Sequence, residues 1–264
     1  MATFDFNFFS KSLKKQTKAT VVIPFDAPEQ EYLNRPKEYC SVYLLHGFSA
    51  NHNEWMSNST LHEFSRMFDC AFIMPDGDKS FYLENKTSGE NYEEYICYEL
   101  PKFVNGLFPL SKRREDITIG GLSMGGFGAL HSGFTRPDYF GNIFALSSAL
   151  IVDQIAEMEV GSKDMICSYD FYNYIFGDLT QLKGSKNDPK FLAKEMMNKG
   201  DCIPNIYLAC GREDFLIEHN RDFKRYLDEI HLPHTYVEDE GTHSWHFWHK
   251  YLLESLNWIK ALER

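Results

Sequence analysis

The sequence of 264 residues predicts an α/β fold in which a mostly parallel central sheet carries helices on both faces. Short apolar runs rich in β-branched and aromatic residues alternate along the chain with longer segments of helical period. Several of the short runs are apolar at every position, which is typical of strands covered on both faces. The expected strands are 20–23, 41–45, 71–74, 117–120, 143–147, 205–209 and 235–238.

Three longer segments keep one apolar face at helical spacing and are expected to be helices. They cover residues 92–107, 216–230 and 248–259. Pro101 lies inside the first segment and should kink that helix, because proline lacks the amide hydrogen that a helix interior requires.

One interval breaks this alternation. Residues 151–203 contain no good strand and many aromatic side chains, as in the segment 169–176. An insertion of this length between core strands is expected to lie above the sheet, on the side where ligands bind. We therefore expect residues 1–264 to form a single domain, with residues 151–203 as a cap-like insertion.

Charge narrows the range of partners. The chain has 27 Lys and Arg against 38 Asp and Glu, a net charge of -11 at pH 7. This charge repels phosphate backbones and anionic lipid headgroups, so we expect neither nucleic acid nor a membrane surface as a partner. No stretch approaches the roughly 20 consecutive apolar residues of a membrane span.

The six cysteines are scattered and never form a C-x-x-C pair. This spacing favours free thiols in a reducing compartment over a disulfide framework or a zinc site. Residues 1–10 lack the basic start of a secretory signal, so we expect a cytoplasmic protein. The oligomeric state stays open, and a homo-oligomer is compatible with the sequence.

The segment Gly121-Leu122-Ser123-Met124-Gly125 matches the G-x-S-x-G pattern, in which a serine lies on a sharp turn between a strand and a helix. An apolar β-branched run precedes it and a helical run follows it, which is the context that the pattern requires. The glycines are needed because side chains at their positions would collide in so tight a turn. Ser123 is therefore the candidate nucleophile.

A serine hydroxyl needs a base, and the base needs an acid that orients it. His243 follows the last expected strand and precedes the last expected helix, where a loop can place an imidazole over the sheet. Asp214 follows the strand 205–209 and is the candidate acid. Glu213 is the neighbouring alternative, whereas Asp239 lies too close to His243 in sequence to reach behind the ring easily.

Backbone amides complete the candidate site. Attack of serine on a carbonyl forms an oxyanion, which two N–H donors stabilise. One donor is expected to be Met124, directly after the nucleophile, and the other Phe48, after the strand that ends in His46-Gly47. His46 itself is expected to be a structural hydrogen-bonding residue.

The sequence shows no metal-binding cluster, no P-loop and no G-x-G-x-x-G motif followed by a phosphate-binding lysine. Hydrolysis by a serine, a histidine and an aspartate needs no cofactor, so we expect neither a metal nor a cofactor.

Four segments carry a resemblance to a known family: residues 44–55, 121–130, 210–216 and 241–248. Together they resemble the esterase D-like α/β-hydrolases, and most closely the bacterial tributyrin esterases. The resemblance implies an α/β-hydrolase fold, with Ser123 as nucleophile, His243 as base and Asp214 as its partner. It also implies hydrolysis of small-molecule esters of small acyl groups. Because the oxyanion loop carries the bulky Phe48 and the aromatic insertion is expected to cover the pocket, we expect a preference for acetyl to butyryl groups. We expect Phe48 and Trp245 to contact the substrate.

Several alternatives remain open. S-formylglutathione hydrolases have a similar elbow, but their oxyanion strand usually ends Ser-Gly-Leu-Thr-Cys, whereas this chain has His46-Gly47-Phe48-Ser49-Ala50. Acetyl and feruloyl esterases that act on plant polysaccharides also resemble it at these motifs, and an acyltransferase would use the same acyl-enzyme. A non-catalytic binding module is disfavoured because all three positions of the Ser, Asp and His set are filled.

Overall fold

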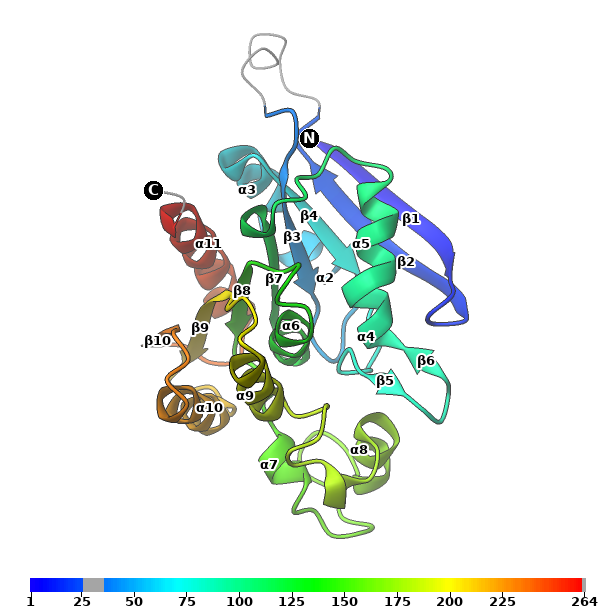
Figure 1. Ribbon diagram of the computed structural model, residues 1–264, viewed down its shortest axis with the longest axis vertical. Coiled ribbons are helices and arrows are strands. Elements are labelled where there is room, and N and C mark those ends of the chain that lie inside the picture. Colours follow the sequence, from blue (N-terminus) through cyan, green and yellow to red (C-terminus); the bar gives the residue numbers. More distant parts are fainter. Residues whose placement is uncertain (26–35, 263–264) are drawn as a thin grey trace.

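The computed structural model describes residues 1–25 and 36–262 (Figure 1). Eight strands form one sheet in the order β1-β2-β4-β3-β7-β8-β9-β10. In this sheet the six strands β4, β3, β7, β8, β9 and β10 run parallel to one another. All seven expected strands lie in this sheet. The strands are β1 (Ala2–Ser10), β2 (Lys15–Ile23), β3 (Cys40–Leu45), β4 (Cys70–Pro75), β7 (Ile117–Leu122), β8 (Asn142–Leu146), β9 (Asn205–Gly211) and β10 (Thr235–Asp239). A separate hairpin joins β5 (Glu84–Asn85) to β6 (Glu90–Asn91).

The first strand, β1, was not expected. It pairs antiparallel with β2 over nine residues and forms one end of the sheet. Its inward side chains include Phe6 and Phe8, whose rings pack against Phe103 of the neighbouring helix layer. Polar residues alternate with these phenylalanines, so β1 is a half-buried strand and not the continuously apolar kind found in the middle of the sheet.

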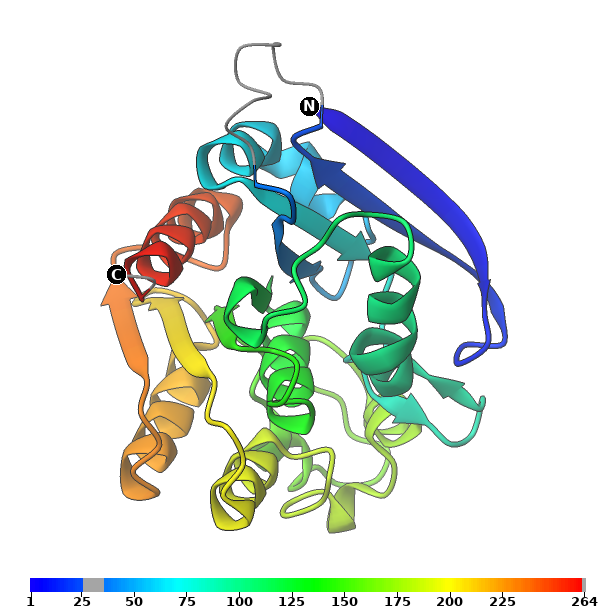
Figure 2. The ribbon, with the colours of Figure 1, turned by 45° about the horizontal axis from the view of Figure 1, so that its top comes forward.

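Helices cover both faces of the sheet (Figure 2). On one face lie α4 (Tyr92–Glu94), a π-helix (Tyr95–Glu99), α5 (Leu100–Asn105), α6 (Met124–Thr135), α9 (Pro189–Lys199) and α10 (Ile217–Glu229). On the other lie α2 (Glu54–Asn58), α3 (Leu61–Phe68) and α11 (Trp245–Leu262). None of the described helices has both the length and the apolar composition of a membrane-spanning segment.

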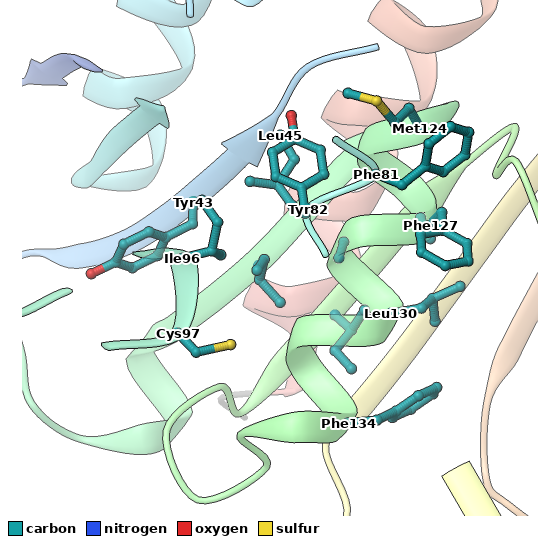
Figure 3. Close-up of a cluster of buried hydrophobic side chains, with 14 of the residues drawn as sticks. Tyr43, Leu45, Phe81, Tyr82, Ile96, Cys97, Met124, Phe127, Leu130 and Phe134 are labelled. Carbon is teal, nitrogen blue, oxygen red and sulfur yellow. The ribbon is translucent and has the colours of Figure 1, made fainter. Parts of the chain in front are cut away.

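The two faces are built by alternation along each buried strand. In β3, Tyr43 and Leu45 belong to the core under α6, whereas Val42 and Leu44 belong to the core under α3 and α11. Figure 3 shows part of the first of these cores, to which Tyr43 and Leu45 of β3 and Phe127 and Leu130 of α6 all contribute. Burial on both faces fixes the register of the central strands, and with it the loops at their ends.

Near Pro101, where a kink was expected, a π-helix at Tyr95–Glu99 directly precedes α5. Proline has no N–H to donate to the carbonyl four residues earlier, which belongs to Cys97. The guanidinium of Arg136 donates to that carbonyl instead, at 2.5 Å. The helix ends at Asn105, so Leu107, expected on its apolar face, is exposed.

The interval 151–203 contains α7 (Val152–Ile155), α8 (Tyr169–Phe176), a 3₁₀ turn (Leu179–Gln181) and α9, with no strand among its residues, all of which are described. α9 packs against α6 and α10 in the ordinary helix layer. α9 therefore belongs to the helix layer. The residues of the interval that line the cavity described below lie between Ile151 and Tyr172.

Candidate active site

Ser123 lies on the turn between β7 and α6, at φ 55° and ψ -118°. This left-handed region is unfavourable for a residue with a Cβ atom. Backbone bonds hold the turn on both sides: the Ser123 N–H donates to the carbonyl of Leu146, and its own carbonyl accepts from Phe127 and Ala149. The hydroxyl of Ser123 thereby faces a cavity above the carboxyl end of the sheet.

Two glycines make this turn sterically feasible. A Cβ atom on Gly121 would lie 2.4 Å from the carbonyl oxygen of Gly125, and one on Gly125 would lie 2.2 Å from the carbonyl oxygen of Leu45. Both distances are far inside van der Waals contact with backbone atoms, which cannot move away easily. The turn therefore requires glycine at both positions that flank the serine in the motif.

Gly125→Ala is expected to lower the free energy of unfolding by about 2–3 kcal/mol, the cost of forcing one extra methyl group into packed backbone. The midpoint of thermal unfolding, followed by circular dichroism, should fall by roughly 5–10 °C. Gly106→Ala is the matched control, because its Cβ atom would lie 3.4 Å from the nearest carbonyl oxygen. Equal unfolding midpoints for the two variants would contradict this account of the turn.

A chain of hydrogen bonds links Ser123, His243 and Asp214. The Ser123 Oγ lies 3.1 Å from His243 Nε2, and His243 Nδ1 lies 2.9 Å and 3.1 Å from the two carboxylate oxygens of Asp214. The Asp214 side chain is fully buried, and the imidazole is 19% exposed. Three residues far apart in sequence thus meet at the ends of β7, β9 and β10. The geometry suits the tautomer of His243 that carries its hydrogen on Nδ1.

Two aromatic rings hold the imidazole in place. The Phe215 ring centre lies 4.6 Å from that of His243, and the Trp248 ring stands edge to face with it at 4.8 Å. The Trp248 indole N–H donates to Ser147 Oγ at 3.0 Å, which fixes the ring. The imidazole can therefore turn little from the line that joins Asp214 to Ser123.

The alternative acids have other partners. Asp239 accepts from Lys250 and from the Tyr251 hydroxyl, and these donors hold the pKa of its carboxyl well below the ordinary value. Glu213 accepts from the Gly241 N–H at 2.7 Å. Neither carboxylate bonds His243, so the structure brings only Asp214 to the ring among the three acids considered.

Side chains hydrogen-bond three successive backbone groups at the end of β3 and in the loop that follows it. The Leu45 carbonyl accepts from the Trp55 indole at 3.1 Å, and the His46 carbonyl accepts from the Tyr82 hydroxyl at 3.0 Å. The Gly47 N–H donates to the carboxylate of Glu54 at 2.6 Å. His46 is buried, and its Nε2 accepts from the Gly77 N–H in the loop after β4 at 2.8 Å, which is consistent with the structural role expected of it.

These bonds determine where the next amide points. The Gly47 carbonyl accepts from His46 Nδ1 at 2.7 Å and from the Ala50 N–H at 3.2 Å. Since C=O and N–H of a trans peptide point in opposite directions, the Phe48 N–H points away from these donors. No acceptor for it lies within residues 1–25 and 36–262. Met124 opens α6, so its N–H has no acceptor inside the helix.

A cavity of about 710 Å³ joins these groups. Ser123, Met124, Phe48 and His243 all line it. Its apolar wall includes Phe81, Ile151, Tyr172, Phe215 and Trp248, and its polar wall includes Glu54, Lys79, Gln154, Asp164 and His219. The arrangement places a nucleophile, a base with its acid, and two free amides around one cavity, which are the groups that acyl transfer requires.

Comparison with known proteins agrees with this chemistry. The sequence model of a family described as "Putative esterase" matches residues 10–259. An acetyl esterase of Caldicellulosiruptor saccharolyticus is 38% identical over 264 residues, which cover 99% of each chain. The chain belongs to this esterase family.

Solved structures show that the esterase has the α/β-hydrolase fold. FphF of Staphylococcus aureus, a fluorophosphonate-binding serine hydrolase, superposes with a TM-score of 0.85 at 30% identity, over 98% of both chains. An S-formylglutathione hydrolase (FrmB) of Staphylococcus aureus gives a TM-score of 0.83 at 29% identity, also over 98% of both chains. The family resemblance and the fold class predicted from the sequence are thereby confirmed.

Of the two residues of the esterase expected to contact the substrate, only Phe48 lines the cavity. Trp245 does not line the cavity; its ring packs against Trp55 and Trp248 at 5.1 Å and 5.5 Å. Trp248, one turn further along α11, faces the cavity instead. The helix begins at Trp245, and the sequence could not show which of two tryptophans three residues apart its first turn would direct inward.

Two other groups of the esterase site were missed. Glu54 is the first residue of α2. Acidic residues are common in the first turn of helices, so its position in the sequence does not distinguish it as a site residue. Asp164 accepts from the Gln154 amide, the Tyr172 hydroxyl and two backbone N–H groups of its own loop. Asp164 thereby shapes the cavity rim that Met165 and Ile166 line, although nothing in its sequence neighbourhood indicates this.

The esterase also has no group of three or more His, Cys, Asp or Glu side chains arranged to bind a metal within its described residues. His246 lies exposed on α11, and His249 packs against Phe64 at 5.6 Å between ring centres. Neither histidine lines the cavity.

Proposed function

We propose that this esterase is a serine carboxylesterase that hydrolyses small-molecule esters of short acyl groups, acetyl to butyryl, through an acyl-enzyme. The hydrogen-bonded chain from Ser123 through His243 to Asp214 carries the proposal. In this proposal Ser123 is the nucleophile, His243 the general base and Asp214 the acid that orients the ring. The six cysteines are all free thiols, which supports a cytoplasmic location.

Acylation begins when Ser123 Oγ attacks the ester carbonyl carbon while His243 Nε2 takes the hydroxyl proton. The carbonyl oxygen becomes an oxyanion, which the N–H groups of Phe48 and Met124 stabilise. When the tetrahedral intermediate collapses, His243 returns the proton to the leaving alcohol oxygen. Deacylation repeats these steps with water as the nucleophile, which releases the acid and restores the Ser123 hydroxyl.

The acyl preference rests on the acetyl esterase relative and on the wall of the cavity. The Phe48 ring packs against Phe81 at 6.0 Å and against Phe171 of α8 at 5.5 Å. A bulky ring on the residue that supplies an oxyanion amide therefore stands beside the reacting carbonyl. Such a wall limits the length of the acyl chain that can lie next to Ser123.

The value of kcat/KM for a series of p-nitrophenyl esters is expected to be highest between acetate and butyrate. Each methylene that fits an apolar wall contributes about 0.8 kcal/mol, so an open groove would instead raise kcat/KM steadily toward octanoate. Emulsified triolein should be a poor substrate. An optimum at eight carbons, or activity that jumps when the substrate forms an interface, would contradict the proposal.

An esterase for aromatic acyl groups such as feruloyl is the second candidate. The observation that favours it is the cavity itself, whose volume of about 710 Å³ and aromatic lining exceed what an acetyl group fills. A panel that adds methyl ferulate and S-formylglutathione to the acyl series separates the candidates. A kcat/KM for methyl ferulate above that for an acetyl ester would favour the second.

A further inference from the structure

Glu54 combines two features that are unusual for a helix-start carboxylate. One carboxylate oxygen, Oε2, accepts from the Gly47 N–H at 2.6 Å and so helps to hold the oxyanion loop. The other, Oε1, has no hydrogen-bond partner in the part of the chain that the structure describes. The residue is half-buried and lines the same cavity as Ser123 and His243. A carboxylate with one oxygen left unpaired among the described residues therefore lies on the wall of the substrate space.

The electrostatic surroundings show that this carboxylate belongs to the reaction centre. Burial raises the pKa of Glu54, while the Gly47 amide and the positive charge that His46 or His243 would carry lower it. His243 is thus near enough for its charge to interact with that of Glu54. Lys79, the cation on the cavity wall, lies over the Phe48 ring at 5.1 Å and forms no ion pair with Glu54 among the described residues.

The geometry of the tetrahedral intermediate indicates which part of the ester meets Glu54. Its oxyanion lies at the Phe48 and Met124 amides, and its leaving oxygen lies at His243 Nε2. Glu54 bonds the oxyanion loop and lies near enough to His243 for their charges to interact, so we place it beside these two oxygens. The acyl group occupies the remaining direction, away from both. The carboxylate therefore meets the alcohol or thiol part of the substrate.

We propose that Glu54 is a specificity-determining residue, which selects esters whose leaving group is neutral or cationic and rejects those whose leaving group is anionic. The inference rests on the proposed esterase function. A binding site can reject the wrong partner by placing a fixed negative charge where that partner would bring its own negative charge, because the two charges repel. Hydroxylated leaving groups, in contrast, can donate to Oε1.

The test uses two acetyl esters of nearly equal shape, acetoxyacetate and 2-acetoxyacetamide, whose leaving groups differ in charge. Both form the same acetyl-enzyme at the same oxyanion site, so the ratio of their kcat/KM values isolates the leaving group. In Glu54→Gln, where the amide oxygen can still accept from Gly47, the value for acetoxyacetate should rise about tenfold relative to that for 2-acetoxyacetamide. Acid release in a pH-stat measures both.

Glu63→Gln is the matched control, because it removes the same charge from an exposed position on α3. Its ratio should stay within twofold of the wild-type ratio. The proposal is overturned if Glu54→Gln also stays within twofold, or if Glu63→Gln shifts the ratio equally.

A second measurement needs no variant. The wild-type protein should hydrolyse acetylcholine with a higher kcat/KM than its neutral isostere 3,3-dimethylbutyl acetate, and the reverse order would overturn the role of Glu54. If the wild-type protein hydrolysed all four acetyl esters with similar kcat/KM values whatever the charge of the leaving group, the specificity role of Glu54 would be overturned and the esterase function would stand. Failure to hydrolyse any of them would overturn the proposed esterase function itself.

Discussion

Ser123→Ala is expected to lower kcat by a factor on the order of 10⁴ or more, as deletion of a triad nucleophile does in other serine hydrolases. The hydroxyl contributes an attacking oxygen and little packing, so the thermal unfolding midpoint should change by only a few degrees. Turnover of p-nitrophenyl acetate measures the loss. Covalent labelling by a fluorophosphonate, which requires an activated serine, should disappear together with it.

Ser148→Ala is a matched control for this experiment. Ser148 is also buried near the turn, but its Oγ has no hydrogen-bond partner among the described residues. This variant should keep both turnover and fluorophosphonate labelling. A Ser123→Ala protein that retains a tenth of the wild-type activity would remove Ser123 from the role of nucleophile.

Asp214→Asn is expected to lower kcat by roughly 10³ to 10⁴. An asparagine that turns its amide group toward His243 donates where the carboxylate accepted, which favours the wrong tautomer of the ring. It also removes the charge that stabilises the imidazolium during turnover. The side-chain oxygen can still accept from the Leu216 N–H, so the loop should keep its shape.

Two neighbouring carboxylates provide the controls. Asp239→Asn weakens a contact to Lys250 and Tyr251, and Glu213→Gln keeps an acceptor for the Gly241 N–H. Neither change should cost more than a few-fold in kcat. If Asp239→Asn proved the more damaging change, the acid of the site would have been assigned to the wrong residue.

Much of this fold could be predicted because short runs rich in β-branched and aromatic residues alternate with helical segments, and several of these runs are apolar at every position. They predicted seven strands, all of which lie in the sheet. The order of the chemical groups was equally informative, since Ser123, Asp214 and His243 each follow a strand whose carboxyl end meets the same edge. Topology brings such groups together whatever lies between them.

What could not be predicted depends on contacts between distant segments. Strand β1 is half-buried because aromatic side chains from distant segments, such as Phe103 and Phe108, cover its inward phenylalanines. The choice between Trp245 and Trp248 depends on the ring of Trp55, which occupies the space beside the first. The role of Glu54 depends on the orientation of one peptide in a loop seven residues earlier, and no periodic pattern records such an orientation.

The backbone of Ser123 has a consequence for the evolution of this protein. A residue with a side chain in that conformation costs on the order of 1–3 kcal/mol, whereas glycine adopts it freely. Glycine at position 123 would therefore relax the turn, and it would also remove the hydroxyl. Selection for thermal robustness and selection for turnover thus act in opposite directions at this position. A stabilisation campaign that scores only resistance to heat would tend to discard the nucleophile first.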